Sequence, residues 1–86
     1  MKKLNWQVIL SNLAEAREQI EAIEARANAG EKIGEVELQI LFEHTYHHLN
    51  FAWNARHISD KEYSRLTDAE FNQFGKYPEE MNAYKV

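Results

Sequence analysis

The sequence contains no cysteine, one proline and three glycines among its 86 residues. Without cysteine, the chain can form no thiolate nucleophile, no cysteine-ligated zinc site and no disulfide bond. With so few residues that interrupt helices, long uninterrupted helices are the expected secondary structure. The glycines are scattered at Gly30, Gly34 and Gly75, so no glycine-rich loop is available to cradle a phosphate group.

Basic residues are also in the minority, with ten Lys and Arg against fourteen Asp and Glu and a net charge of −4. This balance argues against nucleic-acid binding, which needs a basic surface to neutralise phosphates. No apolar run approaches the roughly 20 residues that span a membrane, and polar residues interrupt the N-terminal segment where a signal peptide would need an apolar core. We therefore expect a cytoplasmic protein that binds neither nucleic acid nor membranes.

An apolar heptad pattern occupies the first third of the chain and returns after a short break bracketed by glycines. Its residues follow one another at alternating steps of three and four, which keeps their side chains on one stripe of an α-helix. Such a stripe is the geometry of helix–helix contact. The two stripes are Trp6, Ile9, Leu13, Ala16, Ile20, Ile23 and Ala27, then Leu38, Phe42, Thr45, Leu49 and Ala52.

This pattern predicts an all-α fold built on an antiparallel hairpin of two long helices, at about residues 5–28 and 35–58. The connection between them is short, and short connections force neighbouring helices to run antiparallel. Asn5 is the predicted N-cap of the first helix, and Gly30 is expected to end it in the left-handed conformation. We expect residues 1–86 to form a single helical domain.

The remaining residues predict a short helical, aromatic-rich cap at 59–78 and a tail at 79–86 that carries no strong signal. Ser59 or Asp60 can begin a short turn. Thr67 and Glu70 have the spacing of a capping box, which would start a further short helix that Gly75 closes. We expect this cap to lie over one end of the helix pair.

The second predicted helix is apolar on two sides, and the first helix can cover only one of them. The uncovered side carries Ile40 and Phe51, with His44 and His47 among them. A second copy of the chain would bury it, so we expect a homodimer with a four-helix arrangement. Trp and Arg are common in binding surfaces, although the aromatic residues could instead be core and Arg56 could bond a carbonyl or carboxylate. The predicted interaction surface is Ile40, His47, Phe51, Trp53, Arg56, Phe71, Phe74 and Tyr77.

All four histidines fall within fourteen residues, at His44, His47, His48 and His57. His44 and His48 are one helical turn apart, so both rings can reach one ion, and imidazole is a common ligand of zinc, iron, copper and nickel. Glu37, two turns before His44, could supply a third ligand, as could a second chain. The same histidines could instead be half-buried at a helix boundary, act as a pH switch or serve as a catalytic base.

The sequence contains no catalytic signature, such as a serine in a Gly-x-Ser-x-Gly turn. The favoured interpretation is a non-enzymatic interaction or oligomerisation module that takes no cofactor and forms a dimer or binds a protein partner through its aromatic cap. The alternative is a metal- or small-molecule-binding helical bundle in which His44 and His48 hold a divalent transition metal.

Overall fold

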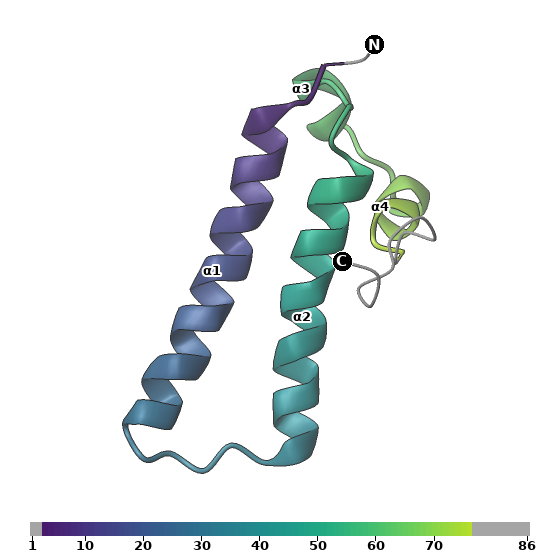
Figure 1. The fold of residues 1–86 in the computed structure, drawn as a ribbon. Helices are drawn as coiled ribbons and strands as arrows, with labels where there is room; N and C mark the ends of the chain where they lie inside the picture. Colours follow the sequence, from purple (N-terminus) through teal and green to yellow (C-terminus); the bar gives the residue numbers. More distant parts are fainter. Residues whose placement is uncertain (1–2, 77–86) are drawn as a thin grey trace, which may run out of the picture.

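The structure, a computed structural model, describes residues 3–76 as a helical hairpin followed by two short helices (Figure 1). Helix α1 (Trp6–Asn28) and helix α2 (Glu35–Asn54) run antiparallel along each other. Helices α3 (Asp60–Tyr63) and α4 (Asp68–Phe74) follow, and the described residues contain no strand. The predicted all-α fold and its hairpin are confirmed.

Both ends of α1 form as the sequence predicts. The side-chain oxygen of Asn5 accepts the amide hydrogen of Val8 at 3.3 Å, which satisfies one of the free donors of the first turn. At the other end, Gly30 takes a φ of 79°, and the Glu31 amide donates to the carbonyl oxygen of Arg26 at 3.1 Å. This left-handed glycine lets the chain turn back on the helix it has just left.

Helix α2 ends at Asn54, four residues before the predicted boundary at 58, because the next segment bonds to the start of α1. The backbone amide of Asn5 donates to the Arg56 carbonyl at 2.6 Å, and its side-chain amide donates to the Ile58 carbonyl at 2.7 Å. Helix propensity depends on neighbouring residues, so it cannot reveal partners that lie more than 50 residues away in the chain. Residues 55–58 therefore turn away from the α2 axis.

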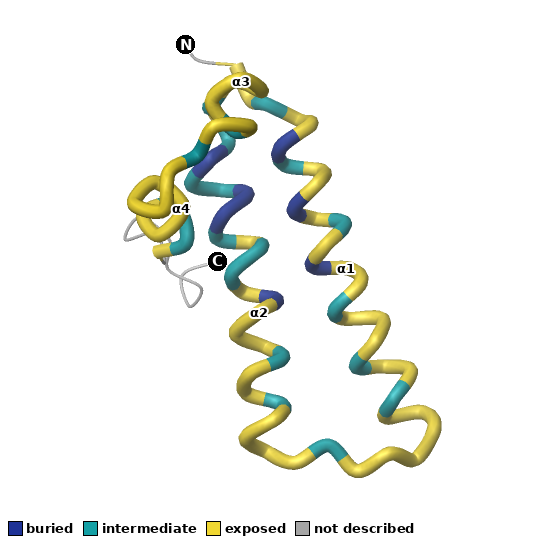
Figure 2. Tube along the Cα trace, turned by 180° about the vertical axis from the view of Figure 1, so that it is seen from behind, coloured by how far each residue is buried: buried dark blue, intermediate teal, exposed yellow. Residues whose placement is uncertain are grey.

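The C-terminal segment has the helix caps that its sequence predicts, but it covers more of the hairpin than the one end expected. Ser59 caps α3 and Thr67 caps α4, each with a complete capping box. Helix α3 lies at the end of the hairpin where the chain begins, whereas α4 runs beside α2 on the side away from α1 (Figures 1 and 2). The segment thus covers a flank of α2 as well as one end of the pair.

Burial is uneven along the hairpin. Buried residues gather in the half near α3, and the half near the connecting loop is largely exposed (Figure 2). The core cluster is Val8, Phe51 and Ala55, with Ile58, Tyr63, Leu66 and Phe74 packed against it. Across residues 3–76, every helix is too short or too polar to cross a membrane.

Candidate functional site

Small and polar residues fill the seam between α1 and α2. They are Val8, Asn12 and Ala16 of α1 and Thr45 and Ala52 of α2. Asn12 is only 5% exposed, and its side-chain amide donates to the Val8 carbonyl at 2.9 Å. Thr45 likewise donates to a carbonyl one turn earlier in its own helix. The buried polar groups are therefore satisfied, as burial requires.

Much of the heptad stripe of α1 lies beside this seam rather than in it. Ala16 is buried, but Trp6, Leu13 and Ile20 are 57%, 40% and 46% exposed. Two helices bury only the residues directly between them, whereas a heptad stripe is fully buried at the centre of a larger bundle. The heptad pattern therefore predicts more burial of these apolar side chains than a single hairpin provides.

One side of the hairpin consequently presents a continuous apolar surface, which we call the open face. Its six large apolar side chains are 40 to 59% exposed: Trp6, Leu13, Ile20, Phe42, Tyr46 and Leu49. Two shallow hollows mark this face. Ile20, Glu24 and Phe42 line one hollow, and Trp6, Leu49 and Arg56 line the other. Tyr46 lines both and joins them.

Another flank of α2 is covered by the chain itself. Phe51 is 2% exposed, and its ring centroid lies 6.1 Å from that of Tyr63, 5.3 Å from Phe71 and 5.8 Å from Phe74. We expected Phe51 to face a second chain, but this placement leaves it inside its own. Phe71 and Phe74 are its covering side chains, and Phe71 remains 47% exposed on its other side.

His47 and Asn54 hold α4 against this flank. The His47 ring lies 5.2 Å from the Phe71 ring, centroid to centroid, and burial lowers its pKa, with a smaller lowering from the charge of His44. The Asn54 amide donates to the carbonyls of Phe74 and Lys76, each at 2.6 Å. These contacts fasten the end of α4 by its backbone.

The other predicted interaction residues are divided between surfaces. Ile40 is 60% exposed in the loop half of α2. The Arg56 guanidinium lies 3.8 Å from the centroid of the Trp53 ring and donates to the Trp53 carbonyl at 2.7 Å. Both residues line the second hollow and so border the open face. Tyr77 lies outside the described residues.

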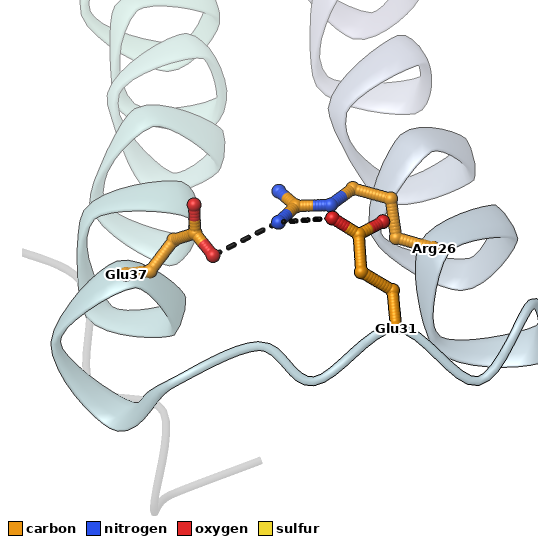
Figure 3. A network of polar contacts seen from close by, with 3 residues as sticks. All are labelled: Arg26, Glu31 and Glu37. Carbon is orange, nitrogen blue, oxygen red and sulfur yellow. Dashed lines mark hydrogen bonds and ion pairs between the residues drawn. The ribbon is translucent and has the colours of Figure 1, made fainter.

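Glu37 is engaged at the loop end of the hairpin (Figure 3). Its carboxylate accepts a hydrogen bond from the Arg26 guanidinium at 2.9 Å, and the same nitrogen lies 3.1 Å from Glu31. These contacts raise the pKa of Arg26, the Glu31 hydrogen bond first and the Glu37 hydrogen bond second. Glu37 thus ties α2 to the end of α1 through a guanidinium.

His44 and His48 form a close pair, the His47 ring lies 5.3 Å from that of His48, centroid to centroid, and His57 lies apart from all three. The Nε2 atoms of His44 and His48 are 3.1 Å apart, and His48 Nδ1 lies 3.4 Å from Asn12 Oδ1. His57 lies beyond the C-terminal end of α2, with its Nδ1 3.2 Å from the Lys3 carbonyl. Within residues 3–76, no three His, Cys, Asp or Glu side chains are already grouped to hold a metal ion.

Sequence reasoning missed Asn12 as the partner of the histidine pair. The heptad pattern places Leu13 in the contact stripe and makes Asn12 a flanking polar residue. Val8 and Ala16 lie one turn before and one turn after Asn12, so the three residues form a second stripe of small side chains. This stripe is the signal in the sequence that could have placed Asn12 in the contact between the helices.

Comparison with known proteins gives no match to a family model, a curated protein or a solved structure.

Proposed function

We propose that this protein is a non-enzymatic oligomerisation module in which a second copy of the chain covers the open face and completes a four-helix dimer. The observation that carries the proposal is the asymmetry of the hairpin. A flank of α2 is covered by α4, while the open face keeps six large apolar side chains 40 to 59% exposed.

The size of the open face suits a stable dimer. Aromatic side chains bury on the order of 150–250 Å² each when fully covered. Trp6, Phe42 and Tyr46 are about half exposed, so they alone offer on the order of 300 Å² per chain, and the aliphatic side chains of the open face add to this area. An apolar patch of several hundred Å² is at the upper end of what a monomer leaves uncovered, and it is a large share of the ~800 Å² per partner of a standard interface.

A second copy is the occupant that best matches the pattern. Both helices contribute to the open face through heptad stripes, and two such faces packed together would direct all four stripes toward a shared axis. A two-fold axis also makes one surface complementary to itself. The charges at the two ends of the open face also fit a dimer. Glu24 lines the hollow nearer the loop, and Arg56 lines the other hollow. A second copy whose loop lies at the opposite end therefore brings Glu24 of one chain near Arg56 of the other.

Two aspartate substitutions distinguish this interface from the one expected on the other side of α2. Ile20→Asp places a carboxylate in the open face, where burial without a partner is costly. Ile40→Asp is the matched control, because Ile40 is also exposed but lies two residues from Phe42, on nearly the opposite side of α2. Sedimentation analysis should give a dimer for the unmodified chain and Ile40→Asp, and a helical monomer for Ile20→Asp.

A monomeric unmodified chain at micromolar concentration contradicts the proposal. Dissociation by Ile40→Asp but not by Ile20→Asp would instead place the interface on the other side of α2. Circular dichroism of both variants separates loss of the dimer from loss of the fold.

A further inference from the structure

The ring of His48 is oriented by a buried amide on the facing helix. Asn12 donates through its side-chain nitrogen to the Val8 carbonyl at 2.9 Å, which directs its oxygen toward His48. That oxygen can only accept, so the facing Nδ1 atom of His48 carries the proton. In the neutral ring, the lone pair is then on Nε2.

This lone pair faces His44. The two Nε2 atoms lie 3.1 Å apart, on side chains one helical turn from each other. Two nitrogen atoms bound to one tetrahedral zinc ion at 2.0–2.1 Å are separated by about 3.3 Å. The pair is therefore close to the separation that a chelated ion requires, and exposed His44 can exchange its proton with solvent.

An acidic side chain lies beside His48. Glu15 lines the same hollow as His48, and its charge is felt at that ring. A carboxylate near His48 adds negative potential that favours a bound cation.

We propose that His44 and His48 bind one divalent transition-metal ion of the zinc, copper or nickel class. Asn12 is the positioning residue, Glu15 supplies nearby negative charge, and water completes the coordination shell. His48, Asn12 and Glu15 line a hollow that shares no lining residue with the two hollows of the open face, so the site lies on a different side of the hairpin. It therefore stands independently of dimer formation.

Calorimetric titration of the untagged chain with zinc chloride at pH 7.5 tests the site. We expect one ion per chain, with an affinity at least tenfold weaker in His44→Gln and in His48→Gln. His57→Gln is the matched control and should bind like the unmodified chain. Repeating the titration in the Ile20→Asp background should leave the affinity unchanged, whatever the oligomeric state.

The positioning role of Asn12 has its own readout. Asn12→Ala should remain helical by circular dichroism but bind zinc about tenfold more weakly, as loss of an orienting partner does at other metal sites. Zinc should also raise the melting temperature of His57→Gln and not that of His48→Gln. Unchanged affinity in His44→Gln or His48→Gln, or an equal loss in His57→Gln, overturns the site. Unchanged affinity in Asn12→Ala overturns the orientation argument.

Discussion

The ring of His47 occupies the space where Gly75, at the end of α4, would carry a side chain. A Cβ atom on Gly75 would lie 3.3 Å from both Cε1 and Nδ1 of the His47 ring. The rings of Phe51 and Phe71 also pack against the imidazole, with centroids 5.8 and 5.2 Å away, which limits the room it has to yield. Gly75 matters here for its lack of a side chain rather than for its backbone conformation, since its φ of −82° is open to any residue.

Gly75→Ala should destabilise the fold by about 1 kcal/mol, because the added methyl group overpacks the contact with His47. The measurement is the free energy of unfolding in urea. Gly34→Ala is the control, since a Cβ there meets nothing within 4 Å, and it should change stability by about 0.5 kcal/mol or less. Equal effects of the two substitutions would show that α4 is not held closely against His47.

The stability of the metal-free protein should fall in mild acid. Burial and the neighbouring His44 lower the pKa of His47, whereas the unfolded chain keeps the ordinary value near 6.5. Below that value the unfolded chain binds the extra proton first, so stability is fully present above about pH 6.5 and is lost as the pH falls toward the lowered pKa.

Urea unfolding with a chelator at pH 8 and pH 5.5, at one protein concentration, measures this change. The free energy of unfolding should fall less in His47→Gln than in the unmodified chain. In His57→Gln it should fall as much as in the unmodified chain. An unreduced decline in His47→Gln would assign the effect to other groups.

Asn5 joins the start of α1 to the segment before α3, so Asn5→Ala should cost about 2 kcal/mol. The substitution removes the cap on Val8 and the side-chain hydrogen bonds to Ile58 and Asp60, at 2.7 and 3.0 Å. Asn28→Ala, at the exposed end of the same helix, should cost about 0.5 kcal/mol or less. Thermal unfolding of both variants checks this, and similar melting temperatures would contradict it.

The proposed dimer should place its two loops at opposite ends. Glu24 and Arg56 border hollows at opposite ends of the open face, so the antiparallel arrangement pairs unlike charges and the parallel one pairs like charges. A Glu24→Cys/Arg56→Cys chain, which has no other cysteine, should on oxidation form a disulfide between position 24 of one copy and position 56 of the other. Peptide mapping that instead finds 24–24 and 56–56 links would favour the parallel arrangement.

Much of the fold follows from signals a few residues apart in the chain. The N-cap at Asn5, the left-handed Gly30 and the capping box at Thr67 all form as predicted. Each depends on groups within one helical turn, which is why the sequence alone predicts them. The histidine pair belongs to the same class, because an i, i+4 spacing brings the two side chains together in any helix.

Tertiary packing decided which side of each helix is covered. The sequence determined that α2 is apolar on two sides, but only the path of residues 59–76 determined that Phe51 lies beneath Phe71 and Phe74. Likewise, the meeting of Asn12 with His48 and of Arg26 with Glu37 depends on the relative rotation of α1 and α2. That rotation is set by the sum of many weak contacts between distant residues, whereas a helix and its caps are set by neighbours along the chain.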